Sequence, residues 1–342
     1  MRLYIPSRTL RSLALTCLAG FPALSQSPLL TSTSVGFSKI ADVVLPKAIT
    51  TIATPLYCDN SGNVYYRGFT ATGPSPEVTR VNASGVSVFS PDSSAPNNSI
   101  VDFAVSQSGA VYLLKGVGFS VEVLSFQPNG TLLSTVKLQM PGLVIPHKLA
   151  LFSSGRLFVY GTKFWKEQPN YARPFLGVFN SDGTFVKKVV AQEIPDGSAF
   201  AAASPLFKGD VPKAVINLAS SSIAAFNDTV YMVDSTATPE LIAISSEGKI
   251  VFHSPVPDVD PGFVVTSVKT AGASAVLEMN ASEGNPAQES LYLTYDLVNK
   301  VAGSRFAMSN AGALACYSDS GSMTFLKTTG GPKLSLVMGT AR

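Results

Sequence analysis

The chain has 342 residues, of which 46% are hydrophobic and only 14% are charged. This length suits one large all-β domain or two ordinary domains with a sizeable core. The 25 Lys and Arg residues exceed the 22 Asp and Glu residues by three, and two histidines are present. This balance argues against the clustered basic footprint of a nucleic-acid-binding protein, and two histidines exclude a His-rich metal site.

The N-terminal segment is predicted to be a secretory signal peptide. Three arginines precede an apolar run over residues 13–24, and Ala23 and Ser25 place small residues at a cleavage site before Gln26. The run is shorter than the roughly 20 residues of a membrane span. We therefore expect a secreted or periplasmic mature chain, residues 26–342, with no membrane span. Loss of the three arginines leaves 22 basic against 22 acidic side chains.

From residue 52 onward, a short apolar strand, a tight turn with glycine and a second strand recur. The turn glycines Gly62, Gly109 and Gly155 are 47 and 46 residues apart, and a second hairpin lies between each pair. Glycine supplies the positive φ that tight hairpins need, and the flanking Val, Phe, Tyr, Leu and Ile residues favour strands. Two hairpins per period give four strands, the pattern of a β-propeller blade.

We therefore expect an all-β chain that folds as a six-bladed β-propeller of four-stranded antiparallel blades. The blades are predicted at residues 52–90, 101–138, 147–190, 221–254, 263–307 and 312–339. The last blade has only three strands, whereas residues 34–46 form a strand without a hairpin partner. We expect this N-terminal strand to complete the sixth blade and close the ring, which hides an exposed edge. An eight-stranded sandwich and a seven-bladed ring are the alternatives.

The hairpin turns follow the pattern D/S-x-S-G-x-[VL]-[YF], most clearly at Asp59, Gly62 and Asn63. These turns resemble those of the NHL-repeat and TolB-like six-bladed propellers, which are common among exported bacterial proteins. The resemblance covers almost the whole mature chain. It implies the architecture and says little about activity.

Long connections gather on one face of the predicted ring, because the turns on the other face are short. Binding residues are often carried by such loops on a rigid scaffold. The loop at residues 162–175 is the richest in aromatic and cationic side chains, which suit a glycan or a peptide. The alternative is that its aromatics cover the blade. The predicted ligand-binding residues are Lys163, Phe164, Trp165, Lys166, Tyr171 and Arg173.

Residues at the beginnings of the innermost strands are expected to line the mouth of the central channel. In similar propeller enzymes, the gluconolactonase and paraoxonase-like lactonases, Glu, Asn and Asp ligands hold a calcium ion at this mouth. Calcium needs about six oxygen donors, and only one carboxylate can be placed here. The histidine is either a general base or a polar rim residue. The predicted mouth residues are Asp102, His147, Lys148, Ser221 and Ser222.

Removal of the leader leaves two cysteines, Cys58 and Cys316, in the innermost strands of blades one and six. An exported protein can use a disulfide to lock the ring. Counted from the turn glycines, the two residues have opposite parity and can meet; counted from the start of each strand, they have equal parity and cannot. The sequence leaves a disulfide and two buried free thiols open, and we favour the thiols.

These features predict a binding module that engages a glycan, a peptide or an envelope protein on the long-loop face. One alternative is a lactonase-like hydrolase with a metal at the channel mouth, and another is a structural scaffold in an envelope assembly. Catalysis is the less favoured hypothesis. No cofactor is predicted apart from calcium in the hydrolase alternative, no nucleic acid is expected as a partner, and the oligomeric state is left open.

Overall fold

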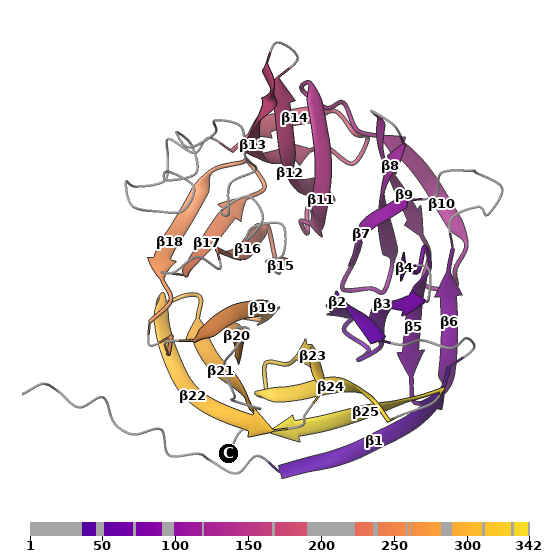
Figure 1. Ribbon diagram of the computed structural model, residues 1–342, viewed down its shortest axis with the longest axis vertical. Coiled ribbons are helices and arrows are strands. Elements are labelled where there is room, and N and C mark those ends of the chain that lie inside the picture. Colours follow the sequence, from indigo (N-terminus) through magenta and orange to yellow (C-terminus); the bar gives the residue numbers. More distant parts are fainter. Residues whose placement is uncertain are drawn as a thin grey trace, which may run out of the picture. The chain divides into compact units, whose positions relative to one another are not determined.

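The computed structural model describes residues 36–45, 51–70, 73–90, 99–117, 120–165, 168–189, 223–234, 239–257, 259–260, 262–281, 289–309, 312–329 and 332–340. These residues lie in one compact unit, Ser32–Arg342, and form β-strands in six antiparallel sheets without a helix. The sheets are arranged as the blades of a ring (Figure 1). The predicted all-β, six-bladed propeller is confirmed.

Each blade has an innermost strand, two middle strands and an outermost strand. The innermost strands are β2 (Thr51–Cys58), β7 (Ser99–Val105), β11 (Leu143–Leu151), β15 (Ile223–Phe226), β19 (Phe263–Ala271) and β23 (Ala313–Tyr317). The outermost strands are β6 (Gly85–Phe89), β10 (Leu132–Lys137), β14 (Phe185–Lys188), β18 (Ile250–Pro255), β22 (Val301–Ser309) and β1 (Gly36–Val44).

The middle strands form two further circles between these. The second strands are β3 (Val64–Thr70), β8 (Val111–Val117), β12 (Leu157–Trp165), β16 (Thr229–Asp234), β20 (Ser274–Ala281) and β24 (Ser322–Thr328). The third strands are β5 (Val78–Asn82), β9 (Ser120–Phe126), β13 (Gln168–Phe179), β17 (Glu240–Ser245), β21 (Glu289–Asp296) and β25 (Lys333–Thr340). The two-residue strand β4 (Gly73–Pro74) pairs with β3.

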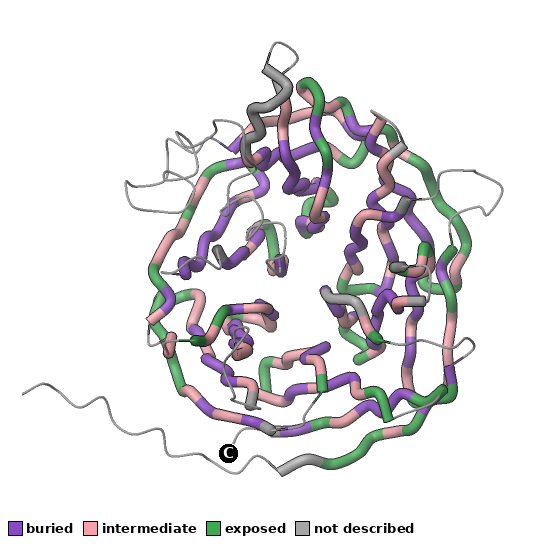
Figure 2. Tube along the Cα trace, viewed as in Figure 1, coloured by how far each residue is buried: buried purple, intermediate pink, exposed green. Residues whose placement is uncertain are grey.

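The core lies between neighbouring blades rather than within one layer. Phe158 and Tyr160 of blade 3 pack with Met232 and Ile242 of blade 4 in one cluster of buried side chains, for example. Middle strands are apolar on both faces because each blade covers its two neighbours, and Figure 2 shows burial falling toward the outermost strands. Because neighbouring blades cover each other's apolar faces, a chain with few charged residues can still bury most of its apolar side chains.

The turn between β2 and β3 shows how glycine and aspartate set the spacing of blades. Oδ1 of Asp59 accepts hydrogen bonds from the backbone N–H groups of Ser61 and Asn63 at 2.9 and 3.0 Å. Oδ2 of Asp59 accepts one from the Tyr65 hydroxyl at 2.8 Å. Gly109, in the next blade, has a φ of 86°, and a Cβ there would lie 2.8 Å from that Oδ2. Glycine is therefore required where the two turns meet.

The ring is closed by the N-terminal strand, as predicted. β1 pairs antiparallel with β25 and becomes the outermost strand of blade 6 (Figure 1). Val43 of β1 is 5% exposed and belongs to the core cluster that blades 1 and 6 share. The hydroxyl of Ser335 donates a hydrogen bond to Oδ1 of Asp42 at 2.6 Å. The first and last parts of the chain are thus held in one sheet.

A disulfide joins Cys58 of β2 to Cys316 of β23, with the two Cα atoms 5.5 Å apart. Of the two alternatives that the sequence leaves open, the structure therefore has the bond and not the free thiols. The count from the strand starts fails because the register of β23 shifts between Leu314 and Cys316. A bulge adds one residue at this point and reverses the parity, so the side chain of Cys316 turns toward blade 1.

Ring closure by β1 predicts that two adjacent valines differ sharply in their contribution to stability. Val43→Ala is expected to lower the free energy of unfolding by about 2 kcal/mol, because it removes buried methyl groups and leaves a cavity. Val44, which is 62% exposed, is the matched control, and Val44→Ala is expected to change it by less than about 0.5 kcal/mol. Urea unfolding followed by fluorescence measures the free energy of unfolding of each variant. Equal losses in Val43→Ala and Val44→Ala would contradict ring closure by β1.

The disulfide predicts that protein produced from residue 26 onward without reductant has no reactive thiol after denaturation. Reduction, or Cys316→Ser, is expected to lower the free energy of unfolding by about 2–5 kcal/mol, because the long closed loop no longer restricts the unfolded chain. A thiol titration in denaturant and unfolding with and without reductant provide the measurements. Two reactive thiols in the oxidised protein would rule out the bond.

Candidate functional site

The channel-mouth residues that the structure describes lie within the innermost strands rather than at their beginnings. Asp102 is in β7 (Ser99–Val105), and His147 and Lys148 are in β11 (Leu143–Leu151). These strands begin before the predicted starts of their blades at residues 101 and 147, because backbone pairing continues across a register shift in each of them. These side chains therefore belong to the inner wall of the ring. Ser221 and Ser222 lie outside the described residues.

Asp102 is buried, and its carboxylate is bound to the backbone of the next blade. Oδ2 accepts a hydrogen bond from the N–H of Leu149 at 2.8 Å, which links blade 2 to blade 3. Burial raises the pKa of Asp102, whereas Lys148, the N–H groups of Leu149 and Phe103, and Arg67 oppose that rise. The one carboxylate that the sequence places at the channel mouth thus already has partners within the fold.

His147 is the residue at which the register of β11 shifts. Its Nε2 lies 2.7 Å from Oγ1 of Thr162, and its ring is 5.7 Å from that of Tyr160. Burial and, to a smaller extent, repulsion by Lys148 lower the pKa of His147. The imidazole is therefore neutral at pH 7, the form that can accept a proton, and Thr162 fixes its orientation. The general-base role stays a prediction.

A second group of charged residues on the inner wall was not predicted. Lys269 of β19 is 8% exposed and donates a hydrogen bond to the carbonyl of Leu56 in β2. Its ammonium nitrogen lies 5.3 Å from the centroid of the Tyr57 ring. Burial lowers the pKa of Lys269 to about 8; Glu278 opposes this shift and Lys148 adds to it. Because β19 and β2 belong to blades 5 and 1, this side chain reaches past blade 6.

Glu278 of β20 completes this group. It is buried and accepts a hydrogen bond from the hydroxyl of Tyr292 at 3.1 Å. Burial raises the pKa of Glu278 to about 7, against the opposing effects of the Tyr292 hydroxyl, Lys269 and the N–H of Leu314. Glu278 can therefore exchange a proton near neutral pH, as catalytic and switch carboxylates do.

The signal for this second group is present in the sequence but weak. Lys269 and Glu278 each stand alone as a charge in an otherwise uncharged strand, FVVTSVKTA and SAVLEMNA. Such a residue must be buried with partners or face a polar space. Lys269 lies near the end of its innermost strand and Glu278 lies in a second strand, so neither belongs to the predicted channel mouth at the beginnings of the innermost strands.

The segment 162–175, predicted as a loop, is largely a β-hairpin. β12 and β13 stay paired up to Trp165 and Gln168, so that only residues 166 and 167 connect them. Its register places Lys163 opposite Arg173 and Phe164 opposite Ala172. The expectation of a loop is wrong because these polar and proline-containing stretches pair with each other and with β11.

The structure describes the ligand-binding residues of this hairpin only in part. Lys163 and Phe164 are half-buried. Lys166 lies outside the described residues, as do the side chains of Trp165, Tyr171 and Arg173. Their role in binding stays a prediction.

Exposed aliphatic side chains stand at the beginnings of two innermost strands. Ile145 of β11 is 50% exposed and Val264 of β19 is 37% exposed, and each lies two residues before the register shift of its strand. Leu143 is exposed as well and pairs with Phe164 of the hairpin, so the two side chains share a face. We call Leu143, Ile145 and Val264 the apolar rim. It lies on the face where the predicted long connections open.

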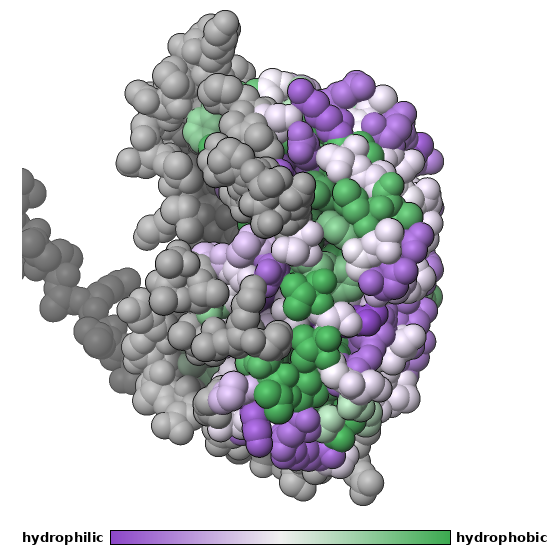
Figure 3. Space-filling model, turned by 90° about the vertical axis from the view of Figure 1, so that its right-hand side faces the viewer, coloured by the Kyte–Doolittle hydropathy of each residue, from purple (hydrophilic) through white to green (hydrophobic). Residues whose placement is uncertain are grey.

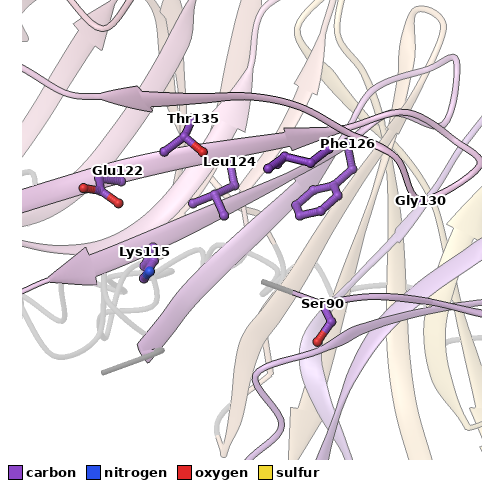
Figure 4. Close-up of a pocket in the computed structure, with 8 residues that line it drawn as sticks. Ser90, Lys115, Glu122, Leu124, Phe126, Gly130 and Thr135 are labelled. Carbon is purple, nitrogen blue, oxygen red and sulfur yellow. The ribbon is translucent and has the colours of Figure 1, made fainter. Parts of the chain in front are cut away.

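A groove of about 410 Å³ lies between blades 1 and 2 (Figure 4). Leu124, Phe126 and Leu132 give it an apolar floor, and Lys115 and Glu122 stand opposite each other on β8 and β9. This side of the ring also carries exposed apolar residues of the outermost strands (Figure 3), among them Val88, Leu132 and Leu133. The sequence indicated neither the groove nor this surface.

In the part of the chain that the structure describes, no three His, Cys, Asp or Glu side chains form a group that could hold a metal ion. Within the same residues, no helix has the length and apolar character to cross a bilayer.

No family model matches this sequence, and no curated protein sequence matches it either. Solved structures are similar in fold. A protein of unknown function from Dyadobacter fermentans has a TM-score of 0.50 and 10% identity over 90% of this chain and 100% of that chain. Virginiamycin B lyase from Staphylococcus aureus has a TM-score of 0.47 and 12% identity over 89% and 99% of the two chains. The calcium-binding protein regucalcin from Agrobacterium tumefaciens has a TM-score of 0.48 and 11% identity over 89% and 96%. Identities this low bear on the fold alone.

The shifted pKa values of Glu278 and Lys269 predict that the free energy of unfolding falls with pH over one range and rises over another. Glu278 has a raised pKa in the folded protein, so its contribution is full below pH 4.5 and is lost as the pH rises through about 7. Lys269 has a lowered pKa, so its contribution is full above pH 10.5 and is lost as the pH falls through about 8. We expect the free energy of unfolding to fall from pH 4.5 to 7 and to rise from pH 8 to 10.5, each by up to about 3 kcal/mol.

Urea unfolding across this pH range measures the profile. Glu278→Gln is expected to remove the fall and Lys269→Met the rise, whereas Glu122→Gln, on β9, is the control that keeps both. A fall that persists in Glu278→Gln would show that another group titrates.

Proposed function

We propose that this protein is an exported propeller that binds a protein or peptide partner on the face where its innermost strands begin. The observation that supports this most is the apolar rim, where Leu143, Ile145 and Val264 are exposed on two blades. Exposed aliphatic side chains on one face of a scaffold are suited to a surface that a partner covers. A rigid ring that presents them needs little reorganisation to bind.

The hairpin of blade 3 extends this surface. β12 and β13 hold nine and twelve residues, and their paired ends carry Phe164 and Lys163 beside the rim. An apolar centre with an aromatic residue and cations around it is the usual composition of a protein interface. Aliphatic side chains favour a peptide or protein over a glycan, because sugars stack on aromatic rings.

Two features support export. The first 25 residues have the organisation of a signal peptide. The bond between Cys58 and Cys316 is of the kind that persists in oxidising compartments. Together with the turn pattern at Asp59, Gly62 and Asn63, they lead us to propose a divergent member of the NHL-repeat and TolB-like propellers.

The lactonase-like alternative has less support at its metal site. Asp102, the one carboxylate predicted at the channel mouth, already accepts a hydrogen bond from the backbone of Leu149. A calcium ion at this position would have to compete with that bond and find about five further oxygen donors. Binding at the apolar rim is therefore the function that we favour.

Selection of peptides from a random displayed library tests this proposal. The wild-type protein is expected to enrich peptides with aliphatic or aromatic side chains, and Ile145→Asp is expected to weaken their binding at least tenfold, because a charge then enters the apolar contact. Val251→Asp is the matched control, since Val251 is 49% exposed on β18 of blade 4. We expect the control to bind as the wild type does.

Two results would count against this function. Peptides that bind wild type and Ile145→Asp equally would place binding elsewhere, and a library that yields no specific peptide would remove the support for a peptide partner. Circular dichroism and urea unfolding of both variants show whether a loss of binding reflects a loss of folding.

A further inference from the structure

The inner wall of the ring carries more positive than negative charge. Lys148 of β11, Lys269 of β19 and Arg67 of β3 approach it from three blades, and Asp102 and Glu278 are the carboxylates near them. Lys148 contributes to the lowered pKa of Lys269, as the smallest of its three causes, because two ammonium groups repel each other. Buried cations usually lie beside a carboxylate that neutralises them.

Neither carboxylate forms an ion pair with these cations, although Glu278 opposes the lowering of the pKa of Lys269. Among the described residues, the ion pairs are those of Lys39, Lys249, His253 and Arg305, and none of them involves an inner-wall lysine. Asp102 accepts a hydrogen bond from the backbone of Leu149, and Glu278 accepts one from Tyr292. The ammonium of Lys269 donates to a neutral carbonyl, that of Leu56. Three cations on this wall thus face two carboxylates, and none of these cations lies within ion-pair distance of either carboxylate.

A buried hydroxyl lies at the same place. The ring of Tyr57 packs edge-on against Phe103 at 5.0 Å and lies 5.3 Å from the ammonium of Lys269. Its hydroxyl is buried and has no hydrogen-bond partner among the described residues. Burial and, to a smaller extent, the nearby Asp102 raise its pKa well above the usual value, so the group stays a hydroxyl and a donor. A buried donor without a partner costs free energy unless a ligand or water accepts from it.

We propose that Lys148, Lys269 and the hydroxyl of Tyr57 form a binding site for a small carboxylate at the centre of the ring. The three residues come from β11, β19 and β2, which border the central opening of the ring (Figure 1). A carboxylate offers two oxygens to these donors and adds one negative charge, which offsets the excess of cations. Phosphate would add nearly two charges beside Asp102 and Glu278. This site goes beyond the proposed peptide-binding function and does not depend on it.

Titration with sodium acetate, with inorganic phosphate as the second arm, tests the site at low ionic strength near pH 7. Calorimetry is expected to show one acetate site with a dissociation constant of about 1 mM or lower. In protein with ¹³C-labelled lysine, acetate is expected to raise the pKa of Lys269 above its value of about 8, because the bound anion favours the ammonium form.

Two variants and one control locate the binding. Tyr57→Phe keeps the ring contact and removes only the hydroxyl, so we expect at least tenfold weaker acetate binding with no loss of stability. Lys148→Met is expected to weaken binding by a similar factor. Lys249→Met is the control, because Lys249 is an exposed lysine that pairs with Glu247 at 3.1 Å.

Three outcomes would overturn the proposal. They are the absence of saturable acetate binding by the wild-type protein, acetate binding that Tyr57→Phe and Lys148→Met leave unchanged, and binding of phosphate but not of acetate. If the peptide selection fails while acetate binds at these residues, the inner site stands and the rim does not.

Discussion

Every blade of this ring depends on the contact between the first blade and the last, because each blade buries its two faces against its neighbours. The junction between these two blades is stabilised both at the outside and at the inside of the ring. The ladder between β1 and β25 closes it at the outside, and the bond between Cys58 and Cys316 closes it at the inside. Lys269 adds a third connection, since it reaches from blade 5 to the backbone of Leu56 in blade 1. The inner-wall charges are arranged as they are only while the ring is closed.

A register shift that recurs in the innermost strands decides which side chains face the centre. It is found in five of them, β2, β7, β11, β19 and β23. In β7, β11, β19 and β23 the shift adds one residue, so the side chains beyond it exchange faces, whereas in β2 it adds two and the faces are kept. Asp102 and Lys148 directly follow the shift, and Cys316 does so as well. One repeated backbone feature therefore sets both the charge of the inner wall and the geometry of the disulfide.

The blades and the closing strand could be predicted because their signals are local: turn glycines at a constant period, and one unpaired strand that matches one incomplete blade. The parity of Cys316 could not be fixed, because a bulge has no reliable mark in the sequence. The hairpin at 162–175 contains Pro169 and Pro174, which are typical of loops, yet pairing with β11 extends it as a sheet. The contact of Lys269 with Leu56 spans 213 residues, and only the closed ring brings them together.

The placement of charge in this chain bears on function. Only 14% of its residues are charged, yet a lysine and a glutamate are buried on the inner wall. Burying an ammonium group costs free energy, and an apolar residue of similar volume is often neutral or more stabilising at such a position. The fold itself therefore does not require Lys269. Among the described residues, Lys269 forms no ion pair and the hydroxyl of Tyr57 has no acceptor, and the proposed anion accounts for both.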